Sequence, residues 1–148
     1  MMEVCVDASL AIKLVVTEAG SDKADALFDQ WASEETQLIA PVFFDVETDS
    51  ILRQKVSLRR ELTFDQAQRA FASLRGLPIK TTHSPEQRVR AWEIAREFQL
   101  PTVYDATYLA LAELRQCEFW TADEKLFKRV RDKLSFVQWL GNYSLNKR

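Results

Sequence analysis

Hydrophobic positions along this chain follow two patterns: short apolar runs and longer stretches with helical spacing. Short runs bounded by turn residues predict β-strands, and they occur at residues 2–6, 37–40, 77–80, 117–121 and 136–139. Apolar residues three, four and seven positions apart predict amphipathic α-helices, at residues 9–16, 21–33, 41–58, 63–74, 84–98, 105–115 and 124–130. Strands that alternate with helices predict a parallel sheet covered on both faces, and therefore an α/β fold.

Residues with strong positional preferences mark where several of these helices begin. Ser21 follows a glycine and is expected to N-cap the second helix. Pro41 suits the first turn of the next helix, which is apolar nearly all round. Two later helices open with capping boxes, formed by Thr63 with Gln66 and by Ser84 with Gln87.

Length and composition limit the kind of protein that this chain forms. Its 148 residues suit a single domain over 1–148, and we find no linker or internal repeat. A hydrophobic content of 47%, with three glycines and four prolines, excludes a disordered or low-complexity chain. We therefore expect one domain with its own hydrophobic core.

The charges argue against a global field that attracts nucleic acid, because 20 Lys and Arg residues face 22 Asp and Glu residues. The first residues lack the features of a secretory signal, and no uncharged apolar run reaches the ~18 residues that a membrane span needs. Cys5 and Cys117 lie in apolar runs, so we expect buried thiols in a reducing cytoplasm. With His83 as the single histidine, carboxylates are left to carry most of the chemistry.

Two aspartates are expected at the same edge of the sheet. Asp7 directly follows the first predicted strand, and Asp123 lies two residues beyond the fourth. Because parallel strands end at one edge, where α/β proteins form their sites, both carboxylates should face one cleft. Each also precedes a helix, so a simple N-cap explains each about equally well. Ser9 and Thr121 lie two residues away and are expected to add hydroxyls to this cleft, although capping explains Ser9 slightly better.

Two further acids lie in helices that are mostly apolar. Asp105 opens one such helix, and Glu47 lies between Phe43 and Ile51 on the wheel of another. Asp49 is placed similarly, so the wheel does not choose between it and Glu47. A buried, unpaired carboxylate is destabilising by several kcal/mol unless it is paired, protonated or bound to metal. Because the donors are oxygens without His or Cys, we expect Mg²⁺ or Mn²⁺.

Four stretches form a pattern when taken together: VDASLAIKLVVTE from residue 6, the helix with Glu47, YDATYLALAE from residue 104 and TADEKLF from residue 121. In this order they resemble the PIN domain family, and within it the VapC toxins of toxin–antitoxin pairs. The resemblance covers essentially the whole chain. It implies a PIN-like three-layer sandwich, with helices flanking a central, mainly parallel sheet of about five strands. It also implies a metal-dependent endoribonuclease.

The same resemblance assigns roles to six residues. The catalytic, metal-binding acids would be Asp7, Glu47, Asp105 and Asp123, with Ser9 and Thr121 beside them. They would hold Mg²⁺ or Mn²⁺ for hydrolysis of RNA. Ser50 departs from the family, whose members often carry at this position an asparagine that orients the helical acid. The family further implies a cytoplasmic homodimer that a VapB-like antitoxin neutralises, with no membrane involved.

Two basic clusters lie close in sequence to these acids. The first comprises Arg53, Lys55, Arg59 and Arg60, with no acid among them, and the second follows Asp123 and includes Lys128 and Arg129. We expect one or both clusters to bind RNA phosphates. Solvated helix faces would explain both clusters equally well.

Two other classes of protein compete with this interpretation. Phosphotransfer folds also place an aspartate after the first strand, but a haloacid-dehalogenase-like phosphatase needs a second acid where Ser9 stands. A receiver domain needs an acidic pair before Asp7, and this chain has none there. A PIN-like RNA-binding or assembly module without catalysis is the other alternative, and Ser50 favours it.

Overall fold

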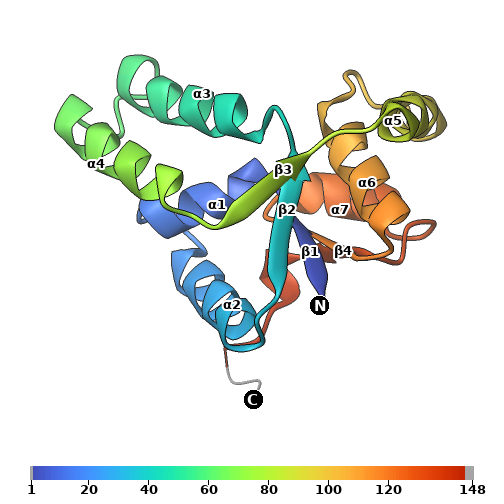
Figure 1. Ribbon diagram of the computed structural model, residues 1–148. Helices are drawn as coiled ribbons and strands as arrows, with labels where there is room; N and C mark the ends of the chain where they lie inside the picture. Colours follow the sequence, from blue (N-terminus) through green and yellow to red (C-terminus); the bar gives the residue numbers. More distant parts are fainter. Residues whose placement is uncertain (1, 146–148) are drawn as a thin grey trace.

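The computed structural model describes residues 2–145 and shows strands alternating with helices (Figure 1). The strands are β1 (Glu3–Val6), β2 (Gln37–Pro41), β3 (Ile79–Thr82), β4 (Glu118–Thr121) and β5 (Val137–Trp139). The helices are α1 (Ala8–Val15), α2 (Ser21–Ser33), α3 (Phe44–Ser57), α4 (Phe64–Arg75), α5 (Pro85–Glu97), α6 (Tyr104–Arg115) and α7 (Glu124–Val130), and a 3-10 turn, η1 (Leu140–Asn142), follows β5. Within residues 2–145, every helix is too short or too polar to cross a membrane.

The five strands form one parallel sheet in the order β3-β2-β1-β4-β5. The predicted α/β class and parallel sheet are therefore confirmed. Strand β1 is central, because Cys5 pairs with Ile39 of β2 on one side and with Phe119 of β4 on the other. The chain order of the strands reverses between β1 and β4. In open α/β sheets, sites form at such a point, beyond the carboxyl ends of the strands.

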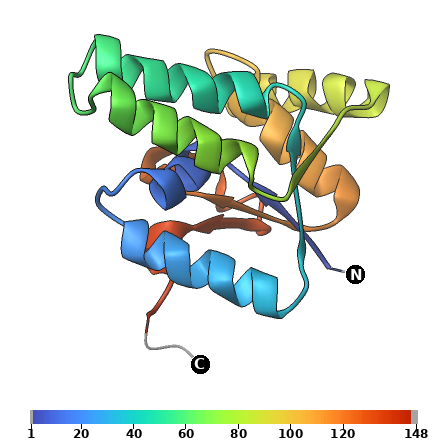
Figure 2. The ribbon, with the colours of Figure 1, turned by 60° about the vertical axis from the view of Figure 1, so that its left-hand side comes forward.

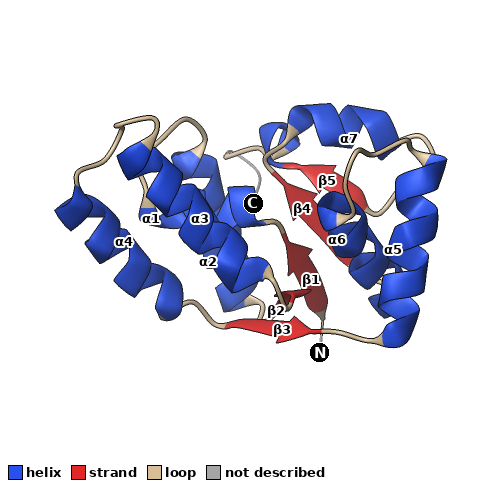
Figure 3. Cartoon of the chain, turned by 90° about the horizontal axis from the view of Figure 1, so that it is seen from above, coloured by secondary structure: helices blue, strands red, loops and turns tan. Residues whose placement is uncertain are grey.

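Helices cover both faces of the sheet and make three layers (Figures 1 and 3). On one face, Val4 and Val6 of β1 pack in a cluster with Trp31 of α2. On the other face, Cys5 packs in a cluster with Leu109 of α6, and α5 lies against α6. Successive side chains of a strand point to opposite faces, so β1 contributes to both cores.

Helices α3 and α4 run antiparallel and pack on α1 (Figure 2). Along α3 the buried residues recur at helical spacing, namely Phe44, Thr48, Leu52 and Lys55. Val46 on the same helix is exposed. The expectation of a helix that is apolar nearly all round is therefore wrong, because α3 lies at the surface and buries a single face.

Two helix starts also differ in detail from the prediction. Gly20, not Ser21, occupies the N-cap position of α2, with a φ of 88° that glycine adopts without strain. The hydroxyl of Ser21 instead bonds to the loop before the helix. The capping box of Thr63 is present. Ser84 accepts its predicted bond from the backbone N–H of Gln87 at 3.1 Å, but the Gln87 side chain is buried in the protein instead of closing a box.

Around the third strand, tertiary pairing overrides local preference. Pro41 ends β2 and pairs with β3 instead of opening a helix, which a proline tolerates at the end of a strand. Strand β3 begins two residues later than the predicted range 77–80, in a register that pairs Leu38 with Ile79.

Cys5 is buried as expected, whereas Cys117 is only partly buried.

Candidate functional site

Asp7 lies directly after β1, and its side chain is held from two directions. Ser9 Oγ donates to Asp7 Oδ2 at 2.9 Å, and Thr121 Oγ1 donates to the same oxygen at 2.7 Å. The carboxylate is 6% exposed. Within the described chain its side chain makes no capping bond to α1, although Asp7 occupies the N-cap position. Asp7 is thus the N-cap residue of α1 by position, but capping alone does not explain a carboxylate that is held by Ser9 and Thr121.

Asp123 follows β4 and does cap the next helix. Its Oδ1 accepts from the backbone N–H of Leu126 in α7 at 3.1 Å. Its own N–H donates to Thr121 Oγ1 at 3.0 Å. Thr121 therefore bonds to both aspartates, and the backbone N–H of Asp7 donates to Trp120 O at 3.1 Å. The sheet thus places these two acids side by side, as strand order predicts.

Glu47 and Asp105 come from the first turns of α3 and α6. Tyr108, one turn beyond Asp105, donates its hydroxyl to Glu47 Oε1 at 2.6 Å and so connects the two helices. The sequence prediction missed Tyr108, although a buried tyrosine in an apolar helix signals a partner for its hydroxyl. Asp49, the alternative to Glu47, lines a separate groove between α3 and α4.

The four acids affect one another electrostatically. Burial raises the pKa of Asp105 to about 7, and the charges of Asp7, Asp123 and Glu47 add to the rise. Burial also raises the pKa of Asp7, with a contribution from the charge of Asp123, while the hydrogen bonds from Thr121 and Ser9 oppose the rise. For Glu47, burial raises the pKa, the bond from Tyr108 lowers it, and the charge of Asp7 raises it further. Four carboxylates thus share one acidic cleft, consisting of Asp7, Glu47, Asp105 and Asp123.

The donors of the acidic cleft suit a hard divalent cation. All are carboxylate oxygens, which Mg²⁺ and Mn²⁺ prefer. Among residues 2–145, no three acids, cysteines or histidines stand close enough to hold an ion as they are now placed. The ion pairs found within residues 2–145 leave all four acids without a Lys or Arg partner. Protonation of Asp105 or a bound cation would offset their mutual repulsion.

A polar pocket of about 360 Å³ adjoins the cleft and is lined by Ser9 and Asp123 together with Arg59. Lys55 also lines it, but this lysine is 7% exposed and is paired with Glu18 at 2.9 Å and Glu61 at 3.0 Å. Of the first predicted basic cluster, Arg59 is thus beside the acids and Lys55 is engaged in ion pairs.

The remaining candidate phosphate ligands are exposed. Arg53 lines the α3–α4 groove, and Arg60 lies in the loop after α3. In the second cluster, Lys128 pairs with Glu124 at 3.2 Å, and Arg129 donates to the backbone of Gln99 at 3.3 Å. Both bonds are at the surface and leave donors available.

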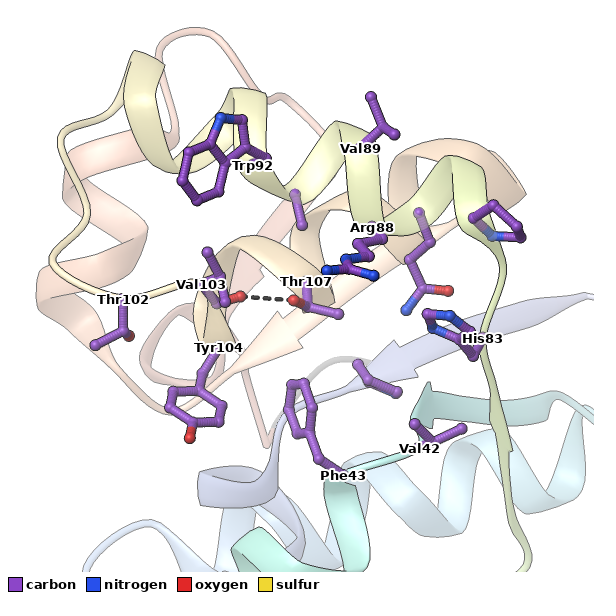
Figure 4. A pocket seen from close by; sticks show the side chains of 14 residues that line it. Val42, Phe43, His83, Arg88, Val89, Trp92, Thr102, Val103, Tyr104 and Thr107 are labelled. Carbon is purple, nitrogen blue, oxygen red and sulfur yellow. Dashed lines mark hydrogen bonds between the residues drawn. The ribbon is translucent and has the colours of Figure 1, made fainter.

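A larger, apolar groove of about 1190 Å³ lies between the start of α3, α5 and the start of α6 (Figure 4). Its side chains include Val42, Val89, Trp92 and Val103, and Trp92 is 72% exposed. Phe43 joins the groove to the cleft, because its ring packs edge-on against Tyr104 (5.3 Å between centroids) and Tyr108 (5.6 Å). Patches of this kind mark interaction surfaces on soluble proteins.

Fold and site together define an α/β protein with a carboxylate cluster at the carboxyl edge of a parallel sheet. A profile of the PIN domain matches residues 4–133. The chain therefore belongs to the PIN domain family, which confirms the resemblance inferred from its sequence.

Solved structures with the same fold include a chain of a toxin–antitoxin complex and a toxin. A toxin–antitoxin complex from Klebsiella pneumoniae has a chain that superposes with a TM-score of 0.66 at 19% identity, covering 93% of this chain and 97% of that one. PAE2754 from Pyrobaculum aerophilum gives 0.62 at 23% identity, over 86% and 84% of the two chains. VapC20 of Mycobacterium tuberculosis, a Sarcin-Ricin loop cleaving toxin, gives 0.61 at 21% identity, over 84% and 93%. No curated protein sequence matches significantly.

Proposed function

We propose that this protein is a Mg²⁺- or Mn²⁺-dependent endoribonuclease and the toxin of a VapBC-type toxin–antitoxin pair. The observation that carries the proposal is the acidic cleft of four carboxylates without ion-pair partners among the described residues, at the sheet edge of a PIN domain. One structural neighbour comes from a toxin–antitoxin complex, and another is a Sarcin-Ricin loop cleaving toxin. These neighbours support the choice of substrate class.

The residues of the cleft would hold the cation and keep its ligands in place. The chemistry that Mg²⁺ or Mn²⁺ would supply there is activation of a water nucleophile and stabilisation of the charge on the leaving oxygen of a phosphodiester. Ser9 and Thr121 fix one oxygen of Asp7. The capping bond of Asp123 engages its Oδ1. Burial raises the pKa of Asp105 to about 7 in the metal-free protein, so this carboxylic acid would release its proton when it binds the cation.

RNA would reach the cleft along its basic margin. Arg59 lines the pocket that contains Asp123, so a phosphate held by this guanidinium would lie next to the acids. Arg53, Arg60, Lys128 and Arg129 are exposed on either side and would contact neighbouring phosphates. A cation in the cleft would offset part of its negative charge and so reduce the repulsion of the RNA backbone.

We propose two protein partners as well. The first is a VapB-like antitoxin, which the toxin–antitoxin complex from Klebsiella pneumoniae supports. The second is another copy of this chain, bound through the apolar groove of Trp92. The free thiols Cys5 and Cys117 support a reducing, cytoplasmic compartment for this assembly.

Cleavage assays test the proposed function. Purified protein is incubated with structured RNA and with a generic phosphatase substrate, with and without Mg²⁺ or Mn²⁺. Metal-dependent RNA cleavage that falls at least ~100-fold in Asp7→Asn and Asp105→Asn supports the ribonuclease, because each variant removes a cleft charge. Cleavage that survives both substitutions comes from a contaminant and overturns the assignment.

The same experiment decides on a second candidate, a PIN-like module that binds RNA without cleaving it. Ser50 favours this alternative, because it replaces an asparagine that many family members carry. RNA binding without turnover under every metal condition would establish it.

Light scattering on the purified protein tests whether two copies of the chain form a dimer through the apolar groove. Trp92→Glu puts a charge on the exposed groove and is expected to convert a dimer into a monomer without unfolding it, since Trp92 is 72% exposed. A monomeric wild type, or a variant that stays dimeric, contradicts the proposed interface.

A further inference from the structure

We propose that Tyr108 is a positioning residue for Glu47 and thereby sets the affinity of the acidic cleft for its cation. This inference rests on the proposed function and deepens it. The sequence pattern of the family directs attention to position 50 as the group that orients the helical acid. In this chain Ser50 is exposed, and the bond to Glu47 comes from Tyr108 instead.

The phenol ring of Tyr108 is immobilised by packing. The residue is 0% exposed, and its ring lies 5.6 Å from the centroid of Phe43 and 5.6 Å from that of Phe119. A ring enclosed in this way has one available orientation, so its hydroxyl stands at a fixed point at the edge of the cleft. From there it donates to Glu47 Oε1 at 2.6 Å.

The bond also links two helices that each supply an acid. Glu47 belongs to the first turn of α3, and Tyr108 lies on α6 three residues after Asp105. The donor and acceptor are 61 residues apart in the chain. By fixing Glu47 relative to α6, the tyrosine fixes Glu47 relative to Asp105 as well. Groups that orient a metal ligand in this way typically change metal affinity about 10–100-fold when they are removed.

Removal of the single hydroxyl tests this role. Tyr108→Phe keeps the packed ring and deletes the donor, and titration calorimetry with Mn²⁺ measures the result without any need for turnover. We expect the dissociation constant for Mn²⁺ to rise about tenfold. Tyr143→Phe is the matched control, because it deletes a hydroxyl that donates to Gln30 at 2.8 Å, away from the acids. This control should bind Mn²⁺ like the wild type.

A double-mutant cycle shows whether the effect passes through Glu47. In a Glu47→Ala background, Tyr108→Phe should change the Mn²⁺ affinity by less than about twofold, because the group that it positions is gone. An equal, tenfold loss in both backgrounds would mean that Tyr108 acts by another route, and the inference would be wrong. If the wild type binds Mn²⁺ and Tyr108→Phe binds it equally well, the inference alone fails. A wild type that binds no Mn²⁺ overturns the proposed function and this inference together.

Discussion

Two neighbouring groups of acids in this protein differ in whether lysines pair with them. Glu18 accepts hydrogen bonds from Lys13 at 3.0 Å and from Lys55 at 2.9 Å. Burial acts to raise the pKa of Glu18, but the bonds from Lys55 and Lys13 outweigh it and lower that pKa. Asp105, in contrast, has no such partner among residues 2–145, and burial raises its pKa to about 7. Glu18 and Asp123 even line the same pocket.

This contrast separates acids that stabilise the fold from acids that we propose bind a ligand. Two lysines near this edge of the sheet, Lys13 and Lys55, form ion pairs with Glu18. The acids of the cleft are therefore unpaired even though basic side chains are present nearby. Like charges held together oppose folding, and proteins tolerate such groups at functional sites. The cleft should therefore be a weak point in stability that a bound cation corrects.

Addition of a divalent cation gives the largest effect expected from this comparison. At a concentration of 100 times the dissociation constant, Mg²⁺ or Mn²⁺ should raise the free energy of unfolding by about 2.7 kcal/mol. Thermal unfolding with metal and with EDTA measures this shift. The shift should vanish in Asp7→Asn and persist in Glu18→Gln, and an unchanged shift in Asp7→Asn would contradict the assignment of the cleft as the metal site.

Disruption of the paired region is expected to have the next largest effect. Lys55→Met removes the nitrogen that bonds to both Glu18 and Glu61. Loss of one partner of a fully buried ion pair is destabilising by about 3–5 kcal/mol. Because Glu18 keeps Lys13 and Glu61 is well exposed, we expect about 2 kcal/mol in chemical denaturation. The stabilisation by Mn²⁺ should be the same in Lys55→Met as in the wild type. A large fall in it would mean that the ion pairs around Glu18 and the acidic cleft are energetically coupled.

The pH dependence of stability tests the unpaired region directly. The pKa of Asp105 is about 7 in the folded protein against 3.8 for the free group. The folded state therefore binds more protons, and stability falls as pH rises from about 4 to 7. Each pKa unit corresponds to about 1.4 kcal/mol, which we reduce to about 1–2 kcal/mol in total because Asp105 is partly exposed.

Asp105→Asn removes this contribution. Without metal, the variant should be more stable than the wild type at pH 8, with the difference shrinking towards pH 4, as followed by denaturant unfolding at several pH values. A difference that does not change with pH would place its cause outside Asp105 ionisation.

The smallest expected effect is on RNA binding, and it distinguishes Arg59 and Arg60 from Lys55. Arg59 lines the pocket of Asp123, is well exposed and lies 3.9 Å from Glu61, whereas Lys55 is buried and bonds to both Glu18 and Glu61. Replacing Arg59 and Arg60 by Ala should weaken RNA binding a few-fold across sequences and reduce its salt dependence by about one counterion per lost phosphate contact. Fluorescence anisotropy at several salt concentrations measures both. Lys55→Met should leave the slope unchanged, and equal slopes for all proteins would exclude Arg59 and Arg60 as phosphate ligands.

Most of the fold could be predicted from the sequence, because periodicity and caps are local signals. The predicted elements are wrong where pairing with a residue far away in the sequence, or the backbone conformation available to glycine, decides the local structure. Pro41 has the local preferences of a helix start, yet its pairing with β3 places it in a strand. Gly20 takes the cap position of α2 because it can adopt a φ of 88°, a property that the pattern of apolar residues does not report.

The acids of the candidate site could be predicted from local signals in the sequence. Their hydrogen-bond partners could not, because tertiary packing brings these partners together. Asp7 and Asp123 follow strands, so sheet topology alone brings them to one edge. Asp105 stands out by its apolar helix. The partner of Glu47 was not predictable, because Tyr108 reaches it only through the packing of α3 near α6. Lys55 shows the same limit, since its partner Glu18 lies 37 residues away.

The bond between Thr121 and Asp7 has a consequence for how the protein is made. These residues are 114 positions apart, and β1 pairs with β4 only after the intervening chain exists. At ~5–20 residues per second, a ribosome needs about 6–23 seconds to add that stretch. During this time the nascent chain carries Asp7 with Ser9 but without Thr121, the second residue that holds its carboxylate. The acidic cleft of the proposed nuclease therefore stays incomplete until Thr121 has been added, which leaves an interval for a partner to meet the nascent chain.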